Sequence, residues 1–293
     1  MQDIDSGRRI YSHDPERLLI PASNLKILTT AAALDTLGQG YRYKTAVYAA
    51  VPPDDDGIIS GDLVVRGVGD PTLSEHFQPK STAVFERWAD ELVAAGIKAI
   101  QGDVIGDRSY FDDEMLARGW SAHYLTDWYA ARVSALSFND NCIDLHLSSG
   151  EAVGSSATLT VFPETTLFRF HTAVRTGDAR SGTPSVSVRV RPCASPSPTD
   201  VFIEGAVPVK TKRRTEWVAV DEPALFAADV LRNVLLAKGI SVKGEARAIS
   251  ASDPLPNYKT MTKVCEYTSP ELLDIVKVVL RRSHNLYSEL LLK

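Results

Sequence analysis

Ser23 and Lys26 lie three residues apart at the start of an apolar segment, a spacing that places both side chains on one face of a helix. Such a serine can act as a nucleophile if the lysine amine takes the hydroxyl proton. Burial and the positive end of a helix both lower the pKa of a lysine, so Lys26 could serve as the base. The N–H groups at the same helix end could stabilise an oxyanion. The pair therefore indicates acyl transfer through Ser23.

The same pair also has an ordinary structural interpretation. A Ser-x-x-Lys spacing is expected by chance about once in a chain of this length. Ser23 would then cap the helix, and Lys26 would lie along the surface with its amine in water. Other segments of the chain decide between the two interpretations.

The element that must position the pair is a helix predicted for residues 24–37. Pro21 precedes it and Gly38 follows its last apolar residue, as is typical of helix ends. Its apolar side chains leave almost no polar face, so we expect a helix buried nearly all round. These side chains are Leu25, Ile27, Leu28, Ala31, Ala32, Leu34 and Leu37.

A second polar group, Ser283-His284-Asn285, interrupts a helical region near the other end of the chain. One helix is predicted to run from Ser269, as N-cap, and Pro270 to about residue 282. Another is predicted for residues 286–292.

We expect the helix of residues 24–37 to pack against these two helices. Ser23, Lys26, Ser283 and Asn285 would then share one cleft, although 260 positions separate the two serines. Acyl transfer requires nucleophile, base and proton relay to lie within hydrogen-bond reach.

The region between these ends is mostly β in character. We expect an α/β (α+β) multidomain fold in which residues 1–50 and 254–293 form a catalytic domain. Residues 51–73 and 149–253 would form a β-rich insertion, and residues 74–148 a nested third domain, with junctions near Val51, Leu73, Ser148 and Asp253. Helices are predicted for 81–95 and 223–238. Strands are predicted for 2–5, 8–12, 41–51, 58–67, 97–106, 143–147, 158–162, 167–172, 185–191 and 201–209.

Composition narrows the class of protein. The chain has 293 residues, a net charge of −5, and 44% hydrophobic and 24% charged residues, as in globular proteins of two or three domains. No apolar run is long enough to span a bilayer. The charge and the lack of a basic stripe argue against a nucleic-acid partner, and the basic run of residues 210–214 is expected to form a turn. The chain carries no signal peptide, and both of its ends read as cut.

Cysteines and histidines show no metal-ligand spacing, and we expect no metal or cofactor. Three scattered cysteines allow one disulfide, and Cys142 with Cys193 is the pair to test in an exported protein. The histidines at positions 13, 76, 123, 146 and 171 have no acid or cysteine partner at a useful spacing, so surface or packing roles are expected for them.

Several segments together resemble the low-molecular-mass class C penicillin-binding proteins, the D-alanyl-D-alanine carboxypeptidase/endopeptidase family. The similarity covers nearly the whole chain. The matching segments are Ile20-Pro21-Ala22-Ser23-Asn24-Leu25-Lys26, Gly69-Asp70-Pro71-Thr72-Leu73, Gly102-Asp103-Val104, Val133-Ser134-Ala135-Leu136 and Ser283-His284-Asn285-Leu286-Tyr287-Ser288-Glu289-Leu290.

The resemblance implies a transpeptidase-like domain with two nested insertions, in an exported protein that acts on peptidoglycan stem peptides and is inhibited by β-lactams. It implies that Ser23 attacks the penultimate D-Ala carbonyl and that Lys26 is the base. Ser283 would relay a proton to the leaving amine, and Asn285 would hold Lys26 and a substrate amide.

The sequence departs from the family pattern at two points. His284 stands where Asp or Asn is more usual, and we expect it to point away from the chemistry. The third motif, Lys-Thr/Ser-Gly, should follow Asn285 but is absent from this chain, and Lys210-Thr211-Lys212 precedes the second motif and lacks the glycine. The resemblance therefore implies that this chain is weakly active or inactive by itself.

An aromatic segment contains Trp120, Asp127, Trp128 and Tyr129. Packing is the usual role of such residues. The resemblance implies that this region reaches over the active site, which makes Trp120, Asp127 and Tyr129 candidates for binding substrate.

Two other functions remain open. One is a β-lactamase or esterase on the same fold, although the second motif begins with Ser283 rather than the tyrosine of one branch of those enzymes. The other is a non-catalytic peptidoglycan-binding scaffold, which the four intact polar residues argue against.

Overall fold

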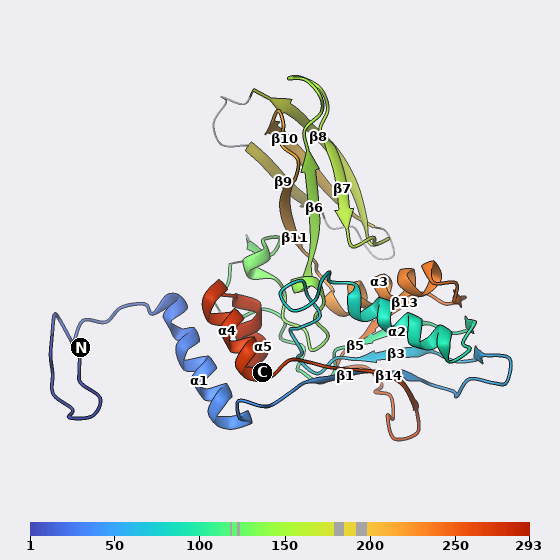
Figure 1. Cartoon of the computed structure of the whole chain (residues 1–293), viewed down its shortest axis with the longest axis horizontal. Helices are drawn as coiled ribbons and strands as arrows, with labels where there is room; N and C mark the ends of the chain where they lie inside the picture. Colours follow the sequence, from blue (N-terminus) through green and yellow to red (C-terminus); the bar gives the residue numbers. More distant parts are fainter. Residues whose placement is uncertain (118, 122–123, 179–184, 192–197) are drawn as a thin grey trace.

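A five-stranded sheet lies at the centre of the molecule (Figure 1). The computed structural model describes the chain except residues 118, 122–123, 179–184 and 192–197. The strand order is β13-β5-β3-β1-β14, in which β1 is antiparallel to β3 and β14, whereas β5 is parallel to β3 and β13. The strands are β1 (Lys44–Ala49), β3 (Leu63–Arg66), β5 (Val104–Asp107), β13 (Ala246–Ile249) and β14 (Thr262–Thr268).

Helices α2 (Ala83–Ala94) and α3 (Pro223–Ala237) pack beside each other on this sheet, α2 against β14 and α3 against β5 and β13 (Figure 1). Their apolar faces form the core through stacked rings, with Phe85 lying between Trp88 and Phe138. A small sheet of β2 (Ile58–Ile59), β4 (Ala99–Ile100) and β12 (Ser241–Val242) borders this core. No helix in the described part of the chain is long and apolar enough to cross a membrane.

Two three-stranded sheets project from the central sheet as an arm (Figure 1). One has the order β11-β6-β7 and the other β8-β10-β9. The buried apolar cluster continues from the central sheet into the arm, as far as Ile203 and Val207. The strands are β6 (Cys142–Ser148), β7 (Thr158–Phe162), β8 (Phe168–Gly177), β9 (Ser185–Arg191), β10 (Thr199–Pro208) and β11 (Arg214–Ala219).

Most predicted elements of the insertion region form where they were expected. The basic run of residues 210–214 connects β10 to β11, and Arg214 is already the first residue of β11. The central sheet contains strands from all three predicted domains. The strands β1 and β14 come from the predicted catalytic domain, β3 and β13 from the β-rich insertion, and β5 from the nested third domain. The division into three domains stays a prediction.

The first residues depart from expectation. The hairpin predicted for residues 2–12 forms only one bridge, between Gln2 and Arg9. Residues 1–20 extend away from the other elements (Figure 1). Their few local hydrogen bonds bury almost no apolar surface, so the alternating pattern does not develop into paired strands.

A group of three helices lies at one end of the central sheet. The helix α1 (Leu25–Leu37) packs on α4 (Leu272–Arg282) and α5 (Asn285–Leu292), with Ala33, Leu272 and Val276 in their shared core. Gly38 ends α1 at a φ of 83°, a conformation that favours glycine.

The expectation that α1 is buried nearly all round is wrong. Lys26, Thr30 and Ala33 are its buried residues, whereas Leu25, Ile27 and Leu28 are 52%, 59% and 66% exposed. The helices α4 and α5 cover only one face, and that face carries the polar side chains. Apolar composition shows what a helix can bury, but not which elements are present to cover it.

The expected N-cap of α4 is also wrong. The N-cap residue is Glu271, and the Ser269 hydroxyl instead accepts a hydrogen bond from the Tyr43 N–H at 2.9 Å. A tertiary contact with the segment before β1 has replaced the local capping bond.

Candidate active site

Ser23 lies in a short 3-10 turn, η1 (Ala22–Asn24), directly before α1. Ser23 is exposed there. The preceding Ala22 has a φ of 46°, a conformation that is uncommon for a residue with a side chain and that often marks functional sites. The turn therefore places Ser23 at the N-terminal end of α1.

Lys26 is the centre of the polar site. Its Nζ lies 3.2 Å from Ser23 Oγ, 3.3 Å from Ser283 Oγ and 2.6 Å from Asn285 Oδ1. The packing of α1 on α4 and α5 thus brings together the four residues that the sequence singled out. Lys26 is 8% exposed, because the two C-terminal helices cover its face of α1.

Burial lowers the pKa of Lys26, as expected for an ammonium group removed from water. The Glu289 carboxylate opposes this shift and raises the pKa of Lys26. In turn, burial raises the pKa of Glu289 and the charge of Lys26 lowers it. Glu289 was not singled out in the sequence, although its position one helical turn after Asn285 could have pointed to it.

Ser283 and Asn285 are held by the sharp connection between α4 and α5. Ser283 ends α4 in the left-handed conformation, at a φ of 51°, and Asn285 is the first residue of α5. The Asn285 amide donates to the Tyr129 carbonyl at 2.7 Å, while its oxygen accepts from Lys26. Both polar atoms of the Asn285 amide group are therefore hydrogen-bonded, which fixes the orientation of this group beside Lys26.

His284 belongs to a separate cluster with Tyr287, Asp140 and His76. It makes no described contact with Lys26 or Ser23. Its ring is buried and stacks on Tyr287 at a centroid distance of 3.8 Å. Its Nδ1 accepts from the Tyr287 N–H at 3.5 Å, so it acts as the N-cap of α5. Its Nε2 lies 3.6 Å from Asp140 Oδ2.

His76 contacts the same carboxylate, with its Nε2 at 3.4 Å from Asp140 Oδ2. The expectation that His76 has no acid partner is wrong, because the fold pairs it with a residue 64 positions away. Although burial raises the pKa of Asp140, the contacts with His284 and His76 bring it well below its ordinary value.

The three proposed substrate contacts lie in the segment that leads to the arm. Tyr129, in η3 (Trp128–Ala130), reaches the site through its main-chain carbonyl. Its hydroxyl donates to Asp127 at 2.7 Å, which is the main cause of a pKa raised to about 12. Trp120 is half-buried earlier in the same segment.

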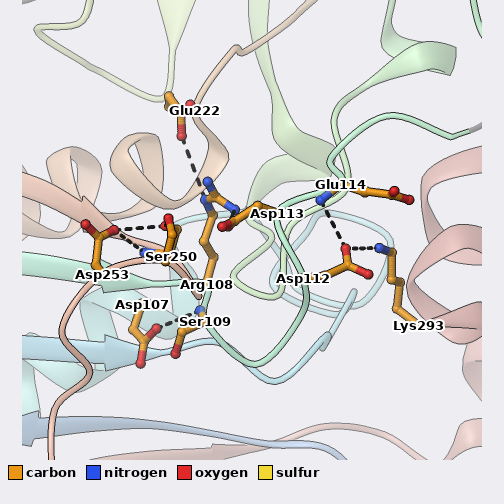
Figure 2. A network of polar contacts seen from close by, with 11 residues as sticks. Asp107, Arg108, Ser109, Asp112, Asp113, Glu114, Glu222, Ser250, Asp253 and Lys293 are labelled. Atoms are coloured by element: carbon orange, nitrogen blue, oxygen red, sulfur yellow. Dashed lines mark hydrogen bonds and ion pairs between the residues drawn. The ribbon is translucent and has the colours of Figure 1, made fainter.

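Ion pairs hold the beginning of this segment in place (Figure 2). Arg108 contacts Asp113 at 2.7 Å and Glu222 at 4.0 Å, and Asp112 pairs with Lys293 at the end of α5. The segment that carries Tyr129 is thereby attached to the helix that carries Asn285.

The remaining candidates lie elsewhere. Cys142 and Cys265 are buried free cysteines, and Cys193 lies outside the described residues, as does His123. His146 contacts Arg213, and His171 pairs with Asp200 at 2.8 Å, both on the arm.

A comparison with known protein families identifies the chain. The sequence profile of the D-Ala-D-Ala carboxypeptidase 3 (S13) family matches residues 1–293. The chain belongs to this family. The resemblance drawn from the motifs is thus confirmed, and so is the expected α/β fold class.

Curated relatives carry corresponding names. The D-alanyl-D-alanine carboxypeptidase of an Actinomadura species is 28% identical over 297 residues, which are 99% of this chain and 52% of that protein. The D-alanyl-D-alanine carboxypeptidase DacB of Haemophilus influenzae is 28% identical over 156 residues, which are 52% of this chain and 31% of that protein. This chain spans about half the length of the first of these relatives.

The fold matches solved structures. The crystal structure of penicillin binding protein 4 from Haemophilus influenzae superposes with a TM-score of 0.76, at 22% identity, over 99% of this chain and 60% of that chain. A crystal structure of that protein complexed with a beta-lactam gives a TM-score of 0.68 at 21% identity, over 99% of this chain and 58% of that chain.

Proposed function

We propose that the protein containing this chain is a serine-type D-Ala-D-Ala carboxypeptidase/endopeptidase that acts on peptidoglycan stem peptides. The observation that carries the proposal is the convergence of Ser23, Ser283 and Asn285 on the buried Lys26 amine. The family membership and the names of the relatives support the same reaction class.

The first chemical step is acylation. Ser23 Oγ attacks the carbonyl carbon of the penultimate D-Ala, and its proton passes to the uncharged Lys26 amine. The tetrahedral intermediate collapses, the C–N bond to the terminal D-Ala breaks, and the leaving amine takes a proton from Lys26 through the Ser283 hydroxyl. The products are free D-Ala and an ester on Ser23.

The second step is hydrolysis of this ester. A water molecule attacks the acyl carbon, releases the shortened peptide and returns the proton to Ser23. Lys26 is the nearest base to Ser23 among the described residues, so it serves in both steps. Asn285, fixed by Lys26 and Tyr129, holds the substrate amide beside Ser23.

The aromatic segment supplies the proposed substrate wall. Tyr129 and Trp128 are 38% and 42% exposed next to the Asn285 contact. Exposed rings beside a reacting group can bind a peptide side chain, with Asp127 and Trp120 as further contacts. A β-lactam would occupy the same place as the D-Ala-D-Ala bond and acylate Ser23.

A stem-peptide substrate places the reaction outside the cytoplasmic membrane. We therefore propose a periplasmic or secreted location for the whole protein. The three-domain division at Val51, Leu73, Ser148 and Asp253 is part of the same proposal.

The test is the release of D-Ala from a peptide that ends in D-Ala-D-Ala, compared with turnover of a chromogenic cephalosporin. D-Ala release that is lost in Ser23→Ala and kept in Ser6→Ala, a matched exposed serine, is the expected result. Rapid cephalosporin turnover without D-Ala release would instead assign a β-lactamase. Peptidoglycan binding with neither reaction would assign a scaffold.

A further inference from the structure

The cluster of His76, Asp140 and His284 has the composition of a metal site. Two imidazole nitrogens and one carboxylate oxygen, all within 4.8 Å of one another, come from three separate segments of the chain. Imidazole and carboxylate are ligands that Zn²⁺ and related divalent transition metals accept. The proposed acyl transfer uses none of these three side chains.

The distances in the cluster fit coordination better than direct hydrogen bonding. The two nitrogens lie 3.4 Å and 3.6 Å from Asp140 Oδ2, beyond the usual range of about 2.7–3.2 Å for an N–H···O bond. Metal–ligand bonds of about 2.0–2.2 Å in a tetrahedron separate neighbouring ligands by roughly 3.3–3.6 Å. Both nitrogen–carboxylate distances therefore match those expected around a shared ion, and the two nitrogens lie within 4.8 Å of each other.

The cluster is bordered by a hydrogen bond that orients the Asp140 carboxylate and by a cavity. The Tyr287 hydroxyl donates to Asp140 Oδ1 at 2.5 Å, which leaves Oδ2 facing the two imidazoles. The cluster also lines a cavity of about 360 Å³ that includes the carboxylates of Glu75 and Asp144. This cavity provides room for water on the ion, and its lining combines the two carboxylates with the guanidinium group of Arg282.

We propose that His76, Asp140 and His284 bind one divalent transition metal ion of the Zn²⁺ class, with the remaining coordination position open to the cavity. The site is separate from the Ser23–Lys26 centre, although His284 lies between Ser283 and Asn285 in the sequence.

The direct test is titration of the tag-free protein with Co²⁺ and Zn²⁺, followed by calorimetry and by the visible absorption of Co²⁺. We expect one ion per chain and the intense absorption of four-coordinate Co²⁺. His76→Gln and Asp140→Asn should each weaken binding at least about 100-fold. His171→Gln is the matched control, because His171 pairs with Asp200 on the arm and should leave the affinity unchanged.

Absence of saturable binding below millimolar metal would overturn the site, as would equal binding by the His76→Gln protein. Ser23→Ala should bind the ion normally, so the result does not depend on the proposed acyl transfer.

Discussion

Three oxygen atoms surround the Lys26 amine, and their arrangement suits a base that must change protonation state. As an ammonium group, Lys26 has three protons for Ser23, Ser283 and Asn285. As an amine it keeps two protons, for Asn285 and Ser283, and turns its lone pair toward the Ser23 hydroxyl. The site therefore accommodates both forms of the lysine without rearrangement.

The charge of Glu289 should set the pH at which Lys26 becomes a base. The rate of penicillin acylation should rise with pH through the lowered pKa of Lys26, because only the uncharged amine accepts a proton. Glu289 raises that pKa, so Glu289→Gln should move the rise to lower pH.

The measurement is the acylation rate across a pH series, with Asp274→Asn as the control. Asp274 is an exposed carboxylate of α4 that pairs with Lys277, and its loss should leave the profile in place. An unchanged or upward-shifted profile in Glu289→Gln would show that Glu289 does not act on the base.

At this scale the sequence singled out the four polar residues that meet at Lys26 but missed their neighbours. Ser23 with Lys26 and Ser283 with Asn285 form short local motifs, so their spacing along the chain points to them. Asp140 and His76 come together only through tertiary structure, and no local pattern marks either residue.

Elements with a sustained apolar pattern form where predicted, whereas the strands β11, β12, β13 and β14 were not predicted. The helices α2 and α3 and strands such as β6 and β9 have several apolar residues in register, and they form where expected. The strands β12 and β13 have two and four residues, too few for a period to show. Their place in the sheets is decided by parallel pairing with β4 and β5, which is a long-range contact.

The loop after β3 contains a buried carboxylate that should make stability depend on pH. Asp70 accepts hydrogen bonds from the Thr72 N–H, the Thr72 hydroxyl and, on β1, the Thr45 hydroxyl. Burial nevertheless raises the pKa of Asp70 from 3.8 to about 6. Because the pKa of Asp70 is higher in the folded than in the unfolded protein, its protonation stabilises the fold. This contribution to the free energy of unfolding is complete below about pH 4 and is lost as the pH rises to about 6.

Asp70→Asn should remove this component of the pH dependence. The shift of about two units corresponds to at most about 3 kcal/mol of unfolding free energy. Urea unfolding between pH 4 and pH 7 would measure the difference, with the exposed Asp55→Asn as the control. If Asp70→Asn and Asp55→Asn changed the pH dependence of stability equally, the buried Asp70 carboxylate would not be the source of that dependence.

For the whole molecule, residues from the two ends of the chain form one site, while the β-rich region lies between them in sequence. The helices α1, α4 and α5 meet beside the central sheet, and the ion pair of Asp112 with Lys293 attaches the segment after β5 to this group (Figure 2). The motifs predicted this meeting. The exposed aliphatic face of α1 was not predictable, because the pattern in one helix does not specify the coverage by others.

The central claim is that Ser23 is the nucleophile and Lys26 its base, and intact-mass analysis of the penicillin-treated protein tests it most directly. We expect a mass gain of one whole penicillin, since opening the β-lactam ring releases no leaving group, and peptide mapping should place it on Ser23. Ser23→Ala should show no adduct, and Lys26→Ala should be acylated at least about 100-fold more slowly than the unsubstituted protein. Ser6→Ala should be acylated as fast as the unsubstituted protein. Equal adduct formation by the parent and Ser23→Ala would contradict the claim.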